Sequence, residues 1–178
     1  MMKEEEITLL EIDACSRLPY GFKATDGNTV YDVLLKQETV PSVSIEGLLA
    51  SEGKIKPILY PLSSITEEIF VNGSEICPMN YLVGAFDFDG YMGFYTTWKF
   101  DQERECVEFF AWGCKVCEMN IQTFFITPEE GKHNSTQLGL RHFQQVFHVL
   151  NQCHIDYRNL IRQGLAVSAL VLDNNPYK

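Results

Sequence analysis

The sequence predicts an α+β protein in which an antiparallel β-sheet packs with helices from the two ends of the chain. Apolar residues recur at helical spacing near both ends, side chains alternate in the middle, and turn residues separate the expected strands. The chain has 178 residues, of which 46% are apolar and 21% charged. These values fit a single domain over residues 1–178, in which strands over 76–127 could form an inserted β-meander.

The first helix is expected over residues 4–18, where apolar residues recur at steps of three and four. Three consecutive glutamates at its start suit a helix N-terminus, which favours negative charge. Pro19 cannot continue the helix. Strands are then expected over 22–25 and 29–35, because the Asp-Gly-Asn sequence at 26–28 is typical of a hairpin turn.

Two further strands are expected over residues 43–49 and 55–62. The second contains two prolines, which cannot donate a backbone hydrogen bond, so it should lie at a sheet edge or be irregular. The Ser-Ile-Thr-Glu sequence at 64–67 has the spacing of a capping box. We therefore expect a short helix after it, ending at the Asn-Gly pair of 72–73.

The most aromatic and most strand-like part of the chain is its middle, residues 81–127. Side chains alternate between two faces over 91–100, and a polar turn follows. The return strand over 106–112 has apolar residues on both faces, which favours a central position. A third strand is expected over 120–127, completing a meander rich in aromatic side chains.

The apolar period becomes helical again from residue 135. The apolar stripe of this amphipathic helix is Leu140, Phe143, Phe147 and Leu150. Asp156 then stands where an N-cap belongs, ahead of a short helix over 157–163. Gly164 is a natural terminator for that helix.

The charge balance excludes some classes of function. Lys and Arg number 14 and Asp and Glu number 24, which gives a net charge of −10. A protein that binds the phosphate backbone needs the opposite balance, so no direct nucleic-acid binding is expected. The sequence also has neither a spanning apolar run nor a secretory signal. We expect a cytoplasmic protein without membrane contact, whose six cysteines are reduced thiols.

Cys114 and Cys117 have the only spacing typical of a metal or redox site. One such pair is half of a zinc site, and no second pair is marked by its spacing. A redox pair should open a helix, whereas the preceding residues predict a strand, in which the two thiols would point to opposite faces. Buried or incidental thiols are favoured, zinc binding and redox chemistry are alternatives, and no cofactor is expected.

Asp87 and Asp89 lie two positions apart and would share one face of a strand. Such a pair of carboxylates could bind a hard cation such as Mg²⁺. The simpler interpretation is a strand whose aspartates face water.

The densest cluster of functional side-chain types near the C-terminus consists of His154, Asp156, Tyr157 and Arg158. A His–Asp pair could carry out acid–base chemistry, and Arg158 could hold an anion. Asp156 already has a role as a helix cap, so we favour binding or assembly over catalysis at this cluster.

Three segments together carry a resemblance: ACSRLPYG at 14–21, IKPILYPLSSITEE at 55–68 and HIDYRNLIRQGLA at 154–166. In their order and amino-acid sequence, these segments resemble a family of uncharacterised proteins from gut anaerobe genomes and their bacteriophages or prophages. Members of that family carry segments of the type ARLPYG, KPYLRPMSSMTEEE and HFDYRGLIEKGLALEA. The family has no known activity, so the resemblance implies a small cytoplasmic accessory protein of mobile-element origin and no catalytic residue.

The function that the sequence favours is a non-enzymatic protein-interaction module, either an accessory protein or an inhibitor. Its acidic charge would complement a basic surface on a protein partner. One alternative is a metal- or thiol-dependent protein that uses Cys114 and Cys117. A second alternative is a binder of a small anionic metabolite through Arg158. The sequence leaves the oligomeric state open.

Overall fold

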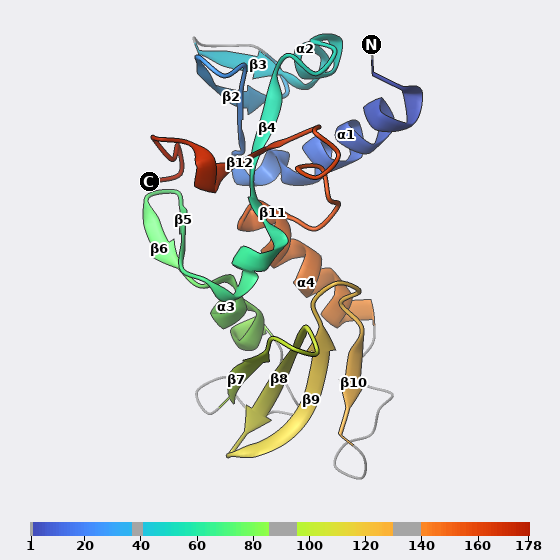
Figure 1. Cartoon of the computed structure of the whole chain (residues 1–178), viewed down its shortest axis with the longest axis vertical. Coiled ribbons are helices and arrows are strands. Elements are labelled where there is room, and N and C mark those ends of the chain that lie inside the picture. Colours follow the sequence, from blue (N-terminus) through green and yellow to red (C-terminus); the bar gives the residue numbers. More distant parts are fainter. Residues whose placement is uncertain (1, 37–40, 86–95, 130–139) are drawn as a thin grey trace. The chain divides into compact units, whose positions relative to one another are not determined.

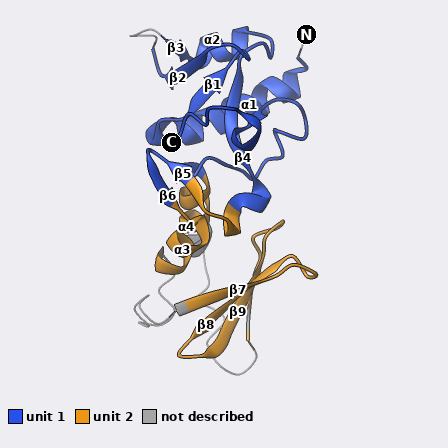
Figure 2. Cartoon of the chain, turned by 60° about the vertical axis from the view of Figure 1, so that its left-hand side comes forward, with its two compact units in different colours: residues 1–64, 70–75, 151–178 blue, residues 65–69, 76–150 orange. Residues whose placement is uncertain are grey.

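The computed structural model describes residues 2–36, 41–85, 96–129 and 140–178 (Figure 1). The chain divides into two compact units (Figure 2). Unit 1 comprises residues 1–64, 70–75 and 151–178, and unit 2 comprises 65–69 and 76–150. The α+β class is confirmed: the described residues form four α-helices and several sheets that are mostly antiparallel. A single domain with a meander inserted at 76–127 stays a prediction.

The main sheet of unit 1 mixes antiparallel and parallel strands. Its order is β11 (Ile155–Asp156), β4 (Lys56–Pro61), β1 (Lys23–Thr25), β2 (Val30–Leu34) and β3 (Ser42–Ser44), and β12 (Val167–Ser168) also pairs with β4. The β4–β1 and β1–β2 pairs are antiparallel. The β2–β3, β4–β11 and β4–β12 pairs are parallel. Strand β4 therefore pairs with the N-terminal hairpin on one side and with the C-terminal segment on the other.

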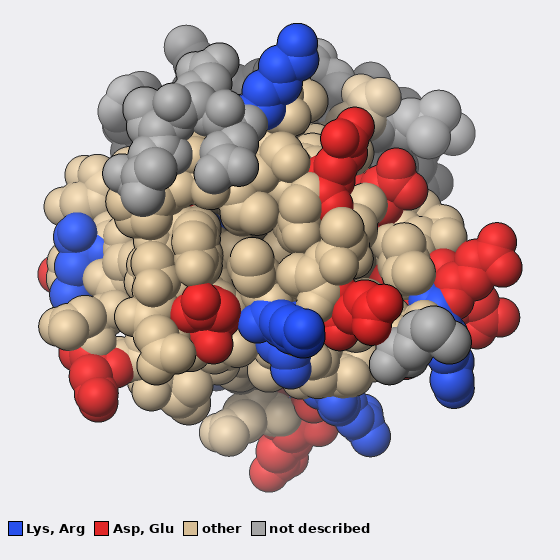
Figure 3. All heavy atoms as spheres, turned by 90° about the horizontal axis from the view of Figure 1, so that it is seen from above, with Lys and Arg blue, Asp and Glu red and all other residues tan. Residues whose placement is uncertain are grey.

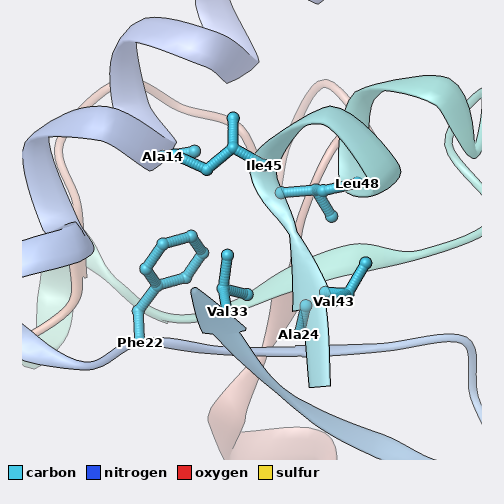
Figure 4. Close-up of a cluster of buried hydrophobic side chains, with 7 residues drawn as sticks. All are labelled: Ala14, Phe22, Ala24, Val33, Val43, Ile45 and Leu48. Atoms are coloured by element: carbon cyan, nitrogen blue, oxygen red, sulfur yellow. The ribbon is translucent and has the colours of Figure 1, made fainter. Parts of the chain in front are cut away.

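The N-terminal helix and hairpin form as expected. Helix α1 spans Glu4–Arg17, and the short 3₁₀ helix Leu18–Tyr20 ends at Gly21 with a φ of 70°. The hairpin turn is held by Asp26, whose carboxylate accepts hydrogen bonds from two backbone N–H groups at 28 and 29. The inner side of this region is a buried apolar cluster (Figure 4) made of Ala14, Phe22, Ala24, Val33, Val43, Ile45 and Leu48.

The strand expected over 43–49 is wrong, because the chain turns into helix α2 (Ile45–Ala50) after β3. Ser44 is the N-cap of this helix: its Oγ accepts a hydrogen bond from the N–H of Gly47 at 3.0 Å. This side-chain cap satisfies a backbone donor that a strand would have to pair elsewhere.

Strand β4 lies inside the sheet, so the expected edge position is wrong. It pairs with β1 on one side and with β11 and β12 on the other. Its prolines occupy the second and last positions, and the interior residues between them, Ile58, Leu59 and Tyr60, are almost completely buried. The prolines therefore leave the middle of the strand free to form its ladder.

The helix expected after residue 64 is also wrong. A 3₁₀ helix spans Leu62–Thr66, and strands β5 (Ile69–Val71) and β6 (Ser74–Ile76) form a two-stranded sheet. Asn72 and Gly73 connect these strands with φ angles of 50° and 80°. Positive φ at both positions is the requirement of a tight hairpin turn, for which Asn-Gly is the preferred sequence.

Unit 2 contains a four-stranded antiparallel sheet, helix α3 (Pro78–Ala85) and all but the last two residues of helix α4 (Leu140–Gln152). The strand order is β10 (Ile126–Pro128), β9 (Cys114–Asn120), β8 (Cys106–Ala111) and β7 (Thr96–Asp101). The central position of β8 and the C-terminal helix agree with expectation. None of the helices in the described part of the chain combines the length and apolar character that crossing a membrane requires.

Two details of unit 2 differ from expectation. The single strand over 120–127 is wrong, because the side chain of Asn120 ends β9 by accepting hydrogen bonds from the N–H groups of residues 122 and 123. In α4 the described buried apolar side chains are Val146, Val149 and Leu150, whereas Phe147 is 37% exposed. The apolar stripe is therefore rotated relative to the one expected.

Candidate functional site

A buried ion pair lies on the inner side of α1. Asp13 and Arg17 are one helical turn apart, and both side chains are inaccessible to solvent. Arg17 donates to both carboxylate oxygens, from Nε at 2.7 Å and from Nη2 at 2.9 Å. Its Nη2 also donates to the carbonyl of Ile155 at 2.8 Å, which fastens α1 to β11. A charge-assisted bidentate pair of this kind holds both side chains in one geometry.

Tyr157 and Arg158 join this ion pair. Arg158 Nε lies 3.2 Å from Oδ1 of Asp13, and Arg158 Nη2 donates to the Tyr157 hydroxyl at 2.8 Å. The guanidinium carbons of Arg17 and Arg158 lie 5.5 and 4.8 Å from the centroid of the Tyr157 ring. The Tyr157 hydroxyl donates to Asn151 Oδ1 at 3.1 Å. One carboxylate and one aromatic ring therefore stabilise two guanidinium groups. We call Asp13, Arg17, Asn151, Tyr157 and Arg158 the arginine cluster.

His154 belongs to a different, apolar contact. Its ring stacks on Tyr177 with centroids 4.5 Å apart and an interplanar angle of 15°. Neither ring nitrogen has a hydrogen-bond partner among the described residues. Burial, together with the positive charges of Arg17 and Lys23, lowers the pKa of His154 to about 3. The ring is neutral at pH 7, and its backbone carbonyl accepts a hydrogen bond from the N–H of Tyr60.

Asp156 caps a backbone turn. Its Oδ1 accepts a hydrogen bond from the N–H of Leu160 and its Oδ2 from the N–H of Ile161, both at 2.8 Å. The helix expected over 157–163 is wrong: the chain forms hydrogen-bonded turns there, which end at Gly164 with a φ of 73°. The acid–base pairing with His154, which the sequence left as a less favoured possibility, is not formed: both oxygens of Asp156 accept backbone hydrogen bonds, and neither ring nitrogen of His154 has a partner among the described residues.

Cys114 and Cys117 both lie in β9, where the strand is irregular. In the register with β8, Cys114 pairs with Ala111 and Cys117 with Phe109, and Val116 is the extra residue of a β-bulge. Because Phe109 and Ala111 share a face of β8, the bulge brings the two cysteines to one face as well. The expectation of opposite faces is therefore wrong.

The two thiols of β9 differ in environment. Cys114 is exposed and Cys117 is buried. Burial raises the pKa of Cys117 to about 12, so this thiol stays protonated at neutral pH. A reactive redox thiol needs the opposite shift, toward a stabilised thiolate.

No three His, Cys, Asp or Glu side chains of the described ranges are grouped so that they could hold a metal ion. The Cys114–Cys117 pair accordingly has no third ligand among these residues. Asp87 and Asp89 lie outside the described residues.

The sheet of unit 2 carries an ion-pair network that was not predicted from the sequence. Lys115 Nζ lies 2.8 Å from a carboxylate oxygen of Glu108 and 2.9 Å from one of Glu118, and Arg104 Nη2 lies 2.8 Å from Glu118. Hydrogen bonds from Lys115 and Arg104 lower the pKa of Glu118. Glu108 and Glu118 are directly opposite across β8 and β9, so the lysine offsets a like-charge repulsion.

A shallow groove of about 490 Å³ lies on the outer side of α1. The residues that line it all belong to this helix: Glu4, Glu5, Thr8, Leu9 and Ile12. Ile12 is 51% exposed, although its side chain is large and apolar. Acidic and basic side chains are interspersed on the molecular face drawn in Figure 3. Within the groove, Leu9 and Ile12 provide apolar surface, and Glu4 and Glu5 place two carboxylates at one end.

Roles for Asp13 and Arg17 and the presence of this groove were not predicted from the sequence. A signal for the ion pair exists, because Leu10, Asp13, Ala14 and Arg17 are spaced for one helical face. Comparisons of the chain with protein-family models, curated protein sequences and solved structures give no match.

Proposed function

We propose that the chain is a non-enzymatic protein-interaction module, an accessory protein or inhibitor of the phage or mobile-element type. One observation carries the proposal: the four C-terminal residues that could have formed a reactive site are engaged in holding the fold. His154 stacks on Tyr177, Asp156 caps a turn, and Tyr157 and Arg158 belong to the arginine cluster.

Exposed apolar side chains also support a binding role. Ile12, Trp112 and Phe125 are 51%, 61% and 63% exposed. Single exposed apolar residues are common on protein surfaces, but large aromatic and aliphatic side chains are also the typical anchors of protein interfaces. These three residues are candidate anchors among the exposed apolar side chains of the described residues.

The charge of the chain indicates the kind of partner. A net charge of −10 attracts basic protein surfaces and speeds their association, and it repels nucleic acids and anionic membranes. We therefore infer a protein partner with a basic surface, and an interaction that weakens as the salt concentration rises.

The test is affinity purification of the tagged full chain from its native cells, at low and at high salt, followed by native mass spectrometry. We expect a protein subunit that is bound to the chain at low salt and released from it at high salt. One zinc ion or one small molecule per chain would overturn it, in favour of the thiol-dependent or the metabolite-binding alternative.

A further inference from the structure

We propose that the outer groove of α1 binds an amphipathic helical segment of the partner protein, with apolar anchors flanked by Lys or Arg. This inference rests on the proposed protein-binding function and adds the site and the chemistry of the partner. The groove is the surface lined by Glu4, Glu5, Thr8, Leu9 and Ile12.

Helix α1 is a rigid platform for such a contact. Its inner face is fixed by the fully buried Leu10 and Ala14 and by the ion pair of Asp13 with Arg17. The guanidinium of Arg17 also donates to a backbone carbonyl of β11. A helix held in this way presents its outer side chains in a fixed order, which lowers the entropic cost of binding.

Side chains on the outer face of α1 line up along the helix axis. Glu5, Thr8 and Ile12 follow one another at steps of three and four, so they form a stripe along the helix. From Glu4 to Ile12 the groove runs about 12 Å along the axis, at 1.5 Å per residue. That length accommodates about two turns of a partner helix, with apolar anchors three or four positions apart.

The carboxylates at one end of the groove select the charge of the occupant. Among the described residues Glu4 and Glu5 have no ion-pair partner, whereas the Glu6 carboxylate accepts the N–H of Lys3 at 2.7 Å. The two carboxylates at one end of the groove and the exposed Ile12 at its other end therefore offer charge and apolar surface about two helical turns apart. A partner segment with Lys or Arg about two turns from an apolar anchor satisfies both features.

The same charges argue against the other possible occupants. A second copy of the chain would bring a net charge of −10 against −10, and a two-fold symmetric contact through this groove would place glutamates against glutamates. An anionic membrane or a nucleic acid would meet the same repulsion. A basic protein segment is the occupant for which the electrostatic contribution is favourable.

The test uses the full chain and a fluorescent synthetic peptide of about 14 residues, with Leu on one helical face and Lys elsewhere. A scrambled peptide of the same composition and a Glu-for-Lys peptide are the controls. We expect the Leu/Lys peptide to bind at least about tenfold more tightly than either control peptide. Amide chemical shifts should change mainly at Thr8, Leu9 and Ile12.

Matched variants locate the site. Ile12→Ser should weaken peptide binding about tenfold, whereas Val171→Ser, at a residue that is 73% exposed on another segment, should leave it unchanged. Glu5→Gln should weaken binding at low salt. Glu46→Gln removes the same charge from the first turn of α2 and should have no effect.

Equal binding of the scrambled peptide would overturn the inference, because it would show charge attraction without a site. The inference would also be overturned if the Ile12→Ser variant bound the Leu/Lys peptide as tightly as the unchanged chain. Amide chemical shifts that change only outside α1 at millimolar peptide would have the same consequence. If the Ile12→Ser variant still captures the native protein partner at full strength, the groove is not the binding site, and the proposed protein-binding function stands. One zinc ion or metabolite per chain in native mass spectrometry would instead remove the proposed function.

Discussion

Asp13 and Arg17 form a bidentate ion pair in which both side chains are completely buried. Arg17 also reaches the carbonyl of Ile155, and Arg158 approaches the same aspartate. Buried charges are costly unless they are paired and hydrogen-bonded, so each member of the set depends on the others. The pair fixes α1, and with it the groove that we propose as the binding site.

Removing the carboxylate of this pair should destabilise the protein strongly. Asp13→Asn leaves the buried guanidinium of Arg17 without its counter-charge, so we expect the free energy of unfolding to fall by about 3–5 kcal/mol. Urea denaturation followed by circular dichroism measures the change. The control is Lys23→Gln, which breaks the partly exposed pair with Asp32 and should cost at most about 1 kcal/mol. Equal small losses in both variants would contradict this role.

The neutral state of His154 should make stability depend on pH. Its pKa is about 3 in the folded chain, because the ring is buried, against 6.5 in the unfolded chain. Between these values the unfolded state binds more protons, so the free energy of unfolding decreases as the pH falls from about 6.5 toward 3. The contribution of this residue approaches about 1.4 kcal/mol per pH unit within that window.

His154→Phe is the variant that isolates this effect. It keeps an aromatic ring against Tyr177 and cannot titrate. Asp26 and Glu118 also have lowered pKa values because of hydrogen bonds, but they are present in both proteins and cancel in the difference. Urea denaturation at several pH values should give a shallower acid slope for the variant. Parallel curves would show that His154 does not contribute.

The cysteines should differ in their rates of alkylation. Burial raises the pKa of Cys117 to about 12, so at pH 8 only about one thiol in ten thousand is a thiolate, and it is covered. Cys15 and Cys114 are exposed. With iodoacetamide and peptide mass spectrometry, both should be modified well before Cys117. Faster modification of Cys117 would contradict the buried environment and would revive a redox role for this pair.

Removing the cap formed by Asp156 should have a moderate cost. Asp156→Ala leaves the N–H groups of Leu160 and Ile161 without their acceptor, and we expect a loss of about 2 kcal/mol in the free energy of unfolding. Ser44→Ala removes a single side-chain cap from α2 and should cost about 1 kcal/mol. Thermal and urea unfolding of the two variants test this order. A smaller loss for Asp156→Ala than for Ser44→Ala would contradict the role of the double cap.

Local sequence signals predicted the elements that local interactions determine. The α1 helix and the hairpin around Asp26 depend on contacts between near neighbours, and both form as expected. The end of the strand at Ser44 and the hairpin at Asn72 also had local signals, a side-chain cap and an Asn-Gly turn. There the apolar pattern and the capping-box spacing favoured the wrong element.

Other features depend on long-range pairing and could not be read from neighbouring residues. The interior position of β4 results from parallel pairing with Ile155 and Val167, about a hundred residues away. The bulge at Val116 shifts the register of β9 by one residue and reverses the expected face of Cys114. In the arginine cluster, Arg158 was singled out, but its partner Asp13 lies 145 positions earlier in the chain.

The most direct test of the protein-binding account is native mass spectrometry of the chain purified from its native cells at low salt and without chelator. The account predicts the 20.4 kDa chain bound to a protein subunit that dissociates as salt is added, with no metal or small molecule attached to the chain itself. A chain that carries one zinc ion or one metabolite would contradict it.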